Sequence, residues 1–306
     1  MPAFSSHYIF AKEMIATVKD ISDFEINEES LFFGAQGPDI FFFHRVFPWM
    51  IGKPLRKSGS LLHRSKPSDI FENMRKYCSK SSNKSIAFSY VYGFILHYAL
   101  DRNCHPYVYF LENKMVEINR LTNPHTAHNL VEFSMDSYLL NKRMGIKNPE
   151  KFDTAETLGC SDDVICEIGQ LLSYVVSNVT GTKITPRQVQ TALKDLKYIQ
   201  RLTLDKYAVK RVFLTIIETL IAPFSKNFKF TAMMRPRDLE KAKKYANIDN
   251  KIWQSPYKKG KRNESFEELF EFSKKDAETM LRAFQRGENC KTFTNNLSFL
   301  TGVEIE

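Results

Sequence analysis

The sequence predicts an all-α fold, and three observations support this prediction. Apolar residues recur every three or four positions through most of the 306 residues, as they do on the buried face of a helix. Several of these stretches begin at Ser or Thr and end at Gly, which are residues that cap helices. No alternation of apolar and polar residues with hairpin turns persists, and there is no internal repeat. We therefore expect a multi-helix bundle.

The N-terminal half contains a predicted turn followed by two predicted helices. In GAQGPDIFFFH, residues 34–44, the glycines Gly34 and Gly37 and the adjacent proline indicate a turn with unusual backbone angles. FILHYALDRNCHPY, residues 94–107, is predicted to be helical and to end near His105, just before Pro106. HTAHNLVE, residues 125–132, is predicted to lie on the following helix.

Three helices can be bounded in the C-terminal half. SDDVICEIGQLLSYVVSNVTG runs from Ser161 to a stop near Gly181. TPRQVQTALKDLKYIQRLTLD has Thr185 as its predicted N-cap, with proline at the first helical position. SFEELFEFSKKDAETMLRAFQRG starts at Ser265, carries acidic residues early and basic residues late, and ends at Gly287.

A looser segment, residues 147–159, divides the chain into two regions of different character. All seven histidines fall within the first 128 residues. We therefore expect residues 1–150 to form a metal-binding catalytic helical region. Residues 151–306 are expected to form a helical C-terminal region that packs on the first as one unit.

Composition restricts where the protein acts and what it contacts. Hydrophobic residues make up 43% of the chain and charged residues 26%, which is typical of soluble globular proteins. The longest apolar stretches are too short for a membrane-spanning helix, so no transmembrane segment is predicted. The N-terminus has no export signal, and the five scattered cysteines include no CxxC pair. A cytoplasmic location with free thiols is expected, with contact at a membrane surface as an option.

Basic residues give the chain a formal net charge of +9 and cluster at residues 53–57 and 258–262. Such clusters usually form a solvated face. They can also attract phosphates, either on a lipid surface or on a nucleic acid. Charge alone leaves both partners open.

Histidine and carboxylate residues recur at helical spacing. His97 and Asp101 are four apart and project from one face of a helix, with His105 one turn further along. His128 and Glu132 repeat this spacing on the next helix. Imidazole nitrogens and carboxylate oxygens are ligands for zinc, so two facing helices of this kind can build a metal site in a bundle core. A single pair of this kind is more often structural, but two pairs with His105 favour metal binding.

Asp39 is expected to be held by the GAQGPD turn. Such an aspartate could simply cap the helix that follows. Fixed in a rigid turn, it could also serve as a metal ligand or general base.

Four motifs in order resemble the zinc-dependent phospholipase C family, which includes bacterial phosphatidylcholine-hydrolysing enzymes and clostridial alpha-toxin. The motifs are SHYIFAKEM, GAQGPD, HYALDRNCHP and HNLVE, and together they span roughly residues 5–135. The resemblance implies an all-α bundle that holds a cluster of zinc ions and cleaves a phosphodiester. In this chain, additional C-terminal helices are expected in place of the toxin's β-sandwich.

The resemblance also implies a set of metal ligands. His7 resembles the early histidine ligand, Asp39 the metal-binding aspartate assigned as general base, and Asp101 the bridging carboxylate. One further histidine ligand is expected between Asp39 and His97, and both His44 and His63 satisfy that order; we prefer His63. The full predicted set is His7, Asp39, His63, His97, Asp101, His105, His128 and Glu132.

His44 and His125 are then expected to be structural or to support the ligands. Secreted members of the family begin with a metal-binding Trp, whereas this chain begins Met-Pro. Two or three zinc ions are therefore expected.

The predicted function is zinc-dependent phosphodiester hydrolysis resembling that of a phospholipase C, with phospholipid or another phosphodiester as substrate. In this interpretation Asp39 orients or deprotonates the attacking water. One alternative is a nuclease on the same scaffold, with nucleic acid as the less favoured partner. Another is a non-enzymatic metal-binding helical protein that docks through its basic face. We also hypothesise an apolar wall near the cleft, formed by Phe41, Phe42, Phe43 and Trp49.

Overall fold

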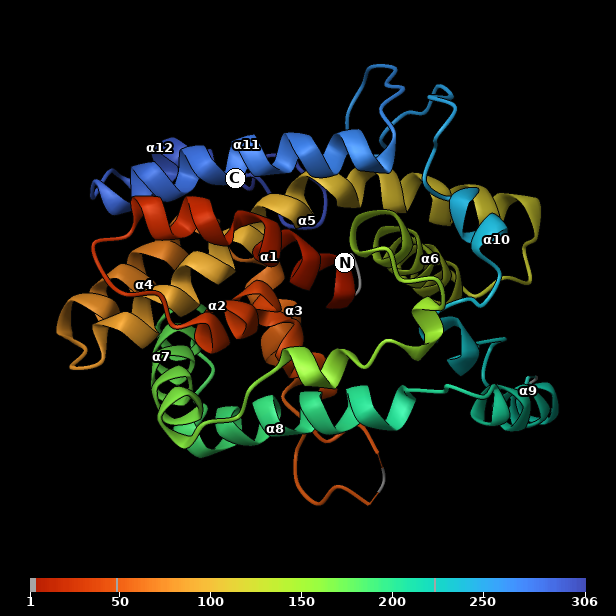
Figure 1. Cartoon of the computed structure of the whole chain (residues 1–306), viewed down its shortest axis with the longest axis horizontal. Helices are drawn as coiled ribbons and strands as arrows, with labels where there is room; N and C mark the ends of the chain where they lie inside the picture. The colour runs from red at the N-terminus through yellow and green to blue at the C-terminus, as the bar shows by residue number, and fades with distance from the viewer. Residues whose placement is uncertain (1–3, 48, 223) are drawn as a thin grey trace.

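Helices form nearly all of the regular structure in the computed structural model, which describes residues 4–47, 49–222 and 224–306 (Figure 1). Over these residues no strand is present; two isolated bridges pair Trp253 with Arg262 and Leu297 with Glu304. The predicted all-α fold is confirmed. The helices are α1 Phe4–Ile21, α2 Glu28–Ala35, η1 Gly37–Phe43, α3 Arg56–Arg64, α4 Pro67–Lys80, α5 Lys84–Ile118, α6 Pro124–Met144, η2 Pro149–Lys151, η3 Thr154–Thr157, α7 Asp162–Thr180, α8 Pro186–Thr203, α9 Val209–Ile221, η4 Phe230–Met233, α10 Leu239–Lys243, α11 Phe266–Gln285 and α12 Cys290–Thr294.

The 35-residue helix α5 is the centre of the bundle. It contacts α1, α2, α4, α6, α7 and α11. Its closest neighbour is α2, because glycines at the crossing let the two backbones meet. A Cβ atom at Gly34 would lie 2.1 Å from the Tyr90 carbonyl oxygen, and one at Gly93 would lie 2.1 Å from the Leu31 carbonyl oxygen.

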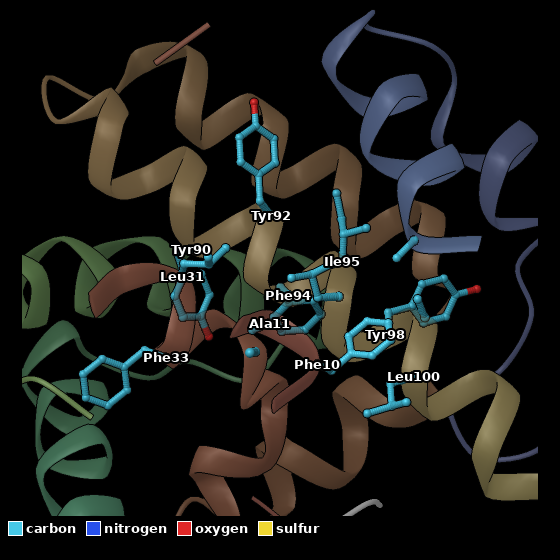
Figure 2. Close-up of a cluster of buried hydrophobic side chains, with 14 of the residues drawn as sticks. Phe10, Ala11, Leu31, Phe33, Tyr90, Tyr92, Phe94, Ile95, Tyr98 and Leu100 are labelled. Atoms are coloured by element: carbon cyan, nitrogen blue, oxygen red, sulfur yellow. The ribbon is translucent and has the colours of Figure 1, made fainter. Parts of the chain in front are cut away.

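Aromatic side chains fill the core around α5. Figure 2 shows Tyr90, Phe94 and Tyr98 of α5 together with Phe10 of α1 and Phe33 of α2, and all five are fully buried. Burying such rings contributes a large share of the apolar area removed from water in a helical core. The core therefore lies where α1 and α2 pack against the middle of α5.

Capping residues set the ends of the three predicted C-terminal helices. Thr185 and Ser265 each form a capping box at the start of α8 and α11, with Gln188 and Glu268 as the reciprocal partners. Gly181 ends α7 in the left-handed conformation. These boundaries confirm the expectations from sequence to within about two residues.

The prediction that the helix ends before Pro106 is wrong. Helix α5 continues through Pro106 to Ile118. Proline removes one backbone donor, but packing on both sides of it holds the helix together. Tyr107 and Val108 are buried just beyond the proline, and the Asn103 amide donates to both the Ala99 carbonyl and Asp276 of α11.

Helices of the second half pack on the first. Helix α11 lies along α5 and α1, while α7 contacts α4, α5 and α3, and α8 contacts η1 (Figure 1). The division of function at residue 150 stays a prediction. In the described residues, no helix combines the length and apolar character needed to cross a bilayer.

Candidate metal centre

The eight predicted ligands come from five elements that converge beside α5. Helix α1 supplies His7, η1 supplies Asp39, α3 supplies His63, and α6 supplies His128 and Glu132, while α5 carries the other three. Their ligand atoms form three groups. In each group, every ligand atom lies within 4.8 Å of the others. The groups are His7, Asp39 and His97; His63, His97 and Asp101; and His105, His128 and Glu132.

Asp101 lies at the junction of these groups and is fully buried. One carboxylate oxygen is 3.3 Å from His7 Nε2, and the other is 3.1 Å from His97 Nε2. The second oxygen also lies 3.9 Å from His63 Nε2 and 3.8 Å from His105 Nδ1. Neither oxygen makes a hydrogen bond. A buried carboxylate in this state is costly unless a cation compensates it, so the donor set fits a bound metal ion.

Four of the histidines are oriented by a hydrogen bond at Nδ1. Where Nδ1–H donates to a carbonyl or carboxylate, the lone pair of Nε2 is left for a metal. The Nε2 atoms of His63, His97 and His105 make no hydrogen bond in the described structure. The Nδ1 contacts are His63 to the Gly59 carbonyl at 2.8 Å, His97 to the Ala35 carbonyl at 3.1 Å, His105 to the Phe299 carbonyl at 2.7 Å, and His128 to Glu112 Oε2 at 2.7 Å.

Burial and neighbouring charges shift the pKa values of the cluster in different directions. Burial opposes ionisation of Asp101, but His97 and His105 hold the pKa of its carboxyl well below its usual range. Burial disfavours the charged form of His97 too, yet Asp101 beside it raises the pKa of that imidazole. Burial lowers the pKa of His105 and His128 well below the usual histidine value. Neutral imidazoles are the forms that bind zinc.

The turn before Asp39 depends on Gly37 rather than on Gly34. Gly37 has a φ of +53°, and a Cβ atom there would lie 2.3 Å from His97 Cδ2. Gly34 is instead helical, within α2, and serves the close contact with α5. Asp39 sits in the first turn of η1 with Oδ1 3.2 Å from His63 Nε2. The expectation that Gly34 forms part of the turn is therefore wrong.

The geometry separates His63 from the other candidate, His44. The Nδ1 atom of His44 accepts a hydrogen bond from the Leu55 backbone N–H at 3.1 Å, which occupies its lone pair. His63 instead directs Nε2 toward Asp39 and Asp101. His125 is exposed at the start of α6. The structure thus favours His63 as the member of the cluster.

The proposed aromatic wall is only partly present. Phe42 stacks on His63 with ring centroids 5.5 Å apart, so it borders the cluster. Phe41 is fully buried in the hydrophobic core, where it cannot line a cleft. Phe43 packs edge-on against Phe4, and Trp49 is 61% exposed and stacks on Phe47. Of these four aromatic residues, all within the described ranges, only Phe42 stacks on a histidine of the cluster.

Supporting residues that the sequence analysis missed hold the ligands in place. Asp136 accepts hydrogen bonds from the backbone N–H groups of Ser5 and Ser6, and so caps the helix that carries His7. Asp136 lies four residues after Glu132 and so continues the HxxxE face of α6. This spacing could have identified it from the sequence. Glu112 and Phe299 hold His128 and His105, but no local pattern marks either residue.

The cluster is most open beside the N-terminal end of α6. The His128 side chain is 17% exposed, whereas that of Glu132 is 7% exposed and those of Asp101 and His105 are fully buried. Of the side chains compared, that of His128 is therefore the one most accessible to solvent.

An all-α bundle that gathers buried imidazoles and carboxylates around one carboxylate defines a helical metal-binding protein. The family model for zinc-dependent phospholipase C matches residues 6–178, more than half of the chain. The chain therefore belongs to the zinc-dependent phospholipase C family, as the resemblance in sequence predicted. No curated protein and no solved structure matches it.

Proposed function

We propose that this protein is a phospholipase C that hydrolyses phospholipids with two or three zinc ions held by His7, Asp39, His63, His97, Asp101, His105, His128 and Glu132. Membership of the family supports a zinc-dependent hydrolase acting on phospholipid. The single observation that carries the proposal is Asp101. Its buried carboxylate faces four imidazoles and makes no hydrogen bond. A buried negative charge in this setting requires a cation beside it.

The residues have distinct proposed roles in the reaction. Zinc, when bound, supplies Lewis acidity that offsets charge on phosphoryl oxygens and makes water a stronger acid. Asp39 takes a proton from the attacking water, whose oxygen forms the new bond to phosphorus. The bond from phosphorus to the glycerol oxygen breaks, and the departing alcohol gains a proton that balances the one removed. Gly59, Ala35 and Phe299 hold the imidazoles through their carbonyl groups.

Elemental analysis and a soluble substrate test the proposal together. Protein purified without chelator should contain about two or three zinc ions per chain. It should hydrolyse a short-chain phosphatidylcholine below the concentration at which that lipid forms micelles. Asp101→Asn should lose most of the zinc, because the change removes the central charge while keeping the side-chain shape. Asp39→Asn should lower turnover by about 10²–10⁴-fold.

Asp20→Asn provides the matched control, because Asp20 is an exposed aspartate on α1 that faces Arg282. This variant should retain both zinc and activity. The proposal fails if the wild-type chain contains no metal and loads none at neutral pH. If zinc is bound but no phosphodiester is cleaved, the protein is a non-enzymatic metal-binding member of the family.

One observation supports a nuclease as the second candidate. Phe47 and Trp49 stack in parallel with ring centroids 4.5 Å apart, and the exposed Lys53, Arg56 and Lys57 follow them in the sequence. Exposed aromatic rings near basic residues can bind single-stranded nucleic acid. Hydrolysis of single-stranded DNA or RNA, with no hydrolysis of phosphatidylcholine, would favour this candidate.

A further inference from the structure

Helix α9 exposes its apolar face to solvent. Five apolar side chains at positions i, i+3, i+4, i+7 and i+11 form one stripe, and each is between 57% and 71% exposed. They are Val209, Val212, Phe213, Ile216 and Leu220. Phe224, just after the helix, is 89% exposed. A surface helix of a globular protein normally turns such a stripe toward the core, so this exposure calls for a partner.

The opposite face of α9 attaches the helix through charged groups. Glu218 is the one buried residue of α9, all of whose residues the structure describes. Its carboxylate accepts hydrogen bonds from the Thr231 backbone N–H at 2.5 Å and the Thr231 hydroxyl at 2.8 Å. Arg211, seven residues earlier, donates to the Met234 and Arg235 carbonyls. The charged residues thus fix the orientation that leaves the apolar stripe outside.

The exposed charges in the chain segment that contains this stripe are of one sign. Between residues 204 and 230 the exposed charged side chains in the described part are Lys206, Lys210, Lys226 and Lys229. Lys210 donates to the Leu202 and Leu204 carbonyls, while the other three lysines flank the two ends of the helix. Apolar side chains flanked by lysines are typical of helices that lie in the surface of an anionic membrane.

We propose that α9 docks this protein on an anionic phospholipid surface, with the apolar stripe among the acyl chains and the lysines at the headgroups. A second copy of the chain is the less favourable occupant. In a symmetric dimer the same surface meets itself, which would bring lysines against lysines. A layer of acidic headgroups complements their charge.

This surface adjoins the open side of the metal centre. The Lys229 backbone N–H donates to the Thr126 hydroxyl at 2.9 Å, and Thr126 lies two residues before His128. The Asn123 amide donates to the Lys226 carbonyl at 3.0 Å. Leu121, two residues before Asn123, is 73% exposed and is a further apolar side chain on this turn. That docking delivers substrate to the cluster rests on the proposed function, whereas docking itself does not.

Vesicle binding tests the proposal with Phe213→Ser and a matched control, Phe272→Ser. Phe213 is 63% exposed on α9 and Phe272 is 56% exposed on α11, so neither change empties the core. Binding is measured by co-sedimentation with sucrose-loaded vesicles of phosphatidylcholine, with and without phosphatidylserine. We expect binding to require phosphatidylserine and to weaken with salt. Phe213→Ser should bind about tenfold more weakly, and Phe272→Ser should match the wild type.

Three outcomes separate this proposal from the proposed function. If no phosphodiester is cleaved but Phe213→Ser still weakens vesicle binding, the docking surface stands and the enzymatic proposal fails. If hydrolysis of monomeric short-chain lipid is normal while Phe213→Ser binds vesicles like the wild type, the docking proposal is overturned. It is equally overturned if the wild type is a dimer in solution that Phe213→Ser converts to a monomer, because the stripe would then be a subunit interface.

Discussion

Individual histidines of this chain are distinguished by the hydrogen bond at Nδ1. In His63, His97 and His105 a backbone carbonyl lies at Nδ1, which turns the Nε2 lone pair toward the cluster. In His44 a backbone N–H lies there instead. The His44 imidazole must therefore be neutral, with its proton on Nε2, to keep this contact. The proton therefore lies on Nδ1 in the three cluster histidines and on Nε2 in His44.

His44 should make the protein less stable in mild acid. Burial, with Arg45 nearby, lowers the pKa of His44 to about 4, against an ordinary value of 6.5. Between these pH values the unfolded chain binds a proton that the folded chain does not, so stability falls as the pH drops from about 6.5 toward 4. In His44→Asn the amide oxygen can accept the Leu55 N–H without titrating. We expect this variant to retain on the order of 1–2 kcal/mol more of its stability across that range.

Urea unfolding of chelated protein at several pH values measures this difference. Other buried histidines also oppose protonation, so the slope of the variant should be reduced rather than abolished. The exposed His125 supplies a control, and His125→Asn should follow the wild type. An identical pH slope in His44→Asn and wild type would show that His44 does not titrate in this way.

Helices α2 and α5 show how packing of elements positions the ligands. Gly93 lies one turn before His97, and the Ala35 carbonyl at the end of α2 accepts the His97 Nδ1–H. The backbone contact between the two helices therefore sets where this imidazole points. A small residue at the crossing is required for the metal centre as well as for the core.

Gly93→Ala should destabilise the protein and weaken metal binding. The added Cβ would lie 2.1 Å from the Leu31 carbonyl oxygen and 2.7 Å from the Ala35 backbone nitrogen, so α2 must move. We expect a loss of about 3 kcal/mol in the free energy of unfolding. Gly145→Ala is the control, because its φ is +68° but no atom lies within 4 Å of the new Cβ. It should cost only about 1 kcal/mol.

Chemical denaturation and zinc content together measure both effects of Gly93→Ala. If this variant is no less stable than Gly145→Ala, the close contact between α2 and α5 is not as tight as the structure indicates.

What the sequence could predict depends on how local each signal is. The HxxxD and HxxxE pairs and the capping residues Thr185 and Ser265 act within one or two helical turns, so spacing alone located them. The continuation of α5 through Pro106 could not be predicted locally, because a contact that supports α5 there comes from Asp276 of α11, more than 150 residues later. The role of Gly34 could not be predicted either, because a glycine needed for helix packing and one needed for a turn look alike in sequence.

At the scale of the whole molecule, the C-terminal segment completes a centre that the N-terminal half begins. Three α5 side chains donate to carbonyls in this segment: Tyr98 to Leu297, Arg102 to Thr294, and His105 to Phe299. These acceptors lie well beyond residues 6–178, which the family model matches. Residues 294–299, at the end of α12 and just after it, thus support α5 and its ligand His105, and motif spacing cannot reveal this long-range dependence.

Phe299→Ala should lower both stability and zinc affinity. The ring is fully buried and lies 4.7 Å from Tyr98 and 5.6 Å from His63, measured between ring centroids. Removing it should cost about 3–5 kcal/mol in the free energy of unfolding. Because the Phe299 carbonyl orients His105, loss of the anchoring ring should also weaken zinc binding by about 10–100-fold. Phe272→Ala, on the exposed face of α11, should change stability by about 0.5 kcal/mol or less.

Urea unfolding and competitive zinc titration under conditions where the variant is folded separate the two effects. A destabilised variant with wild-type zinc affinity would mean that this segment stabilises the bundle without positioning His105.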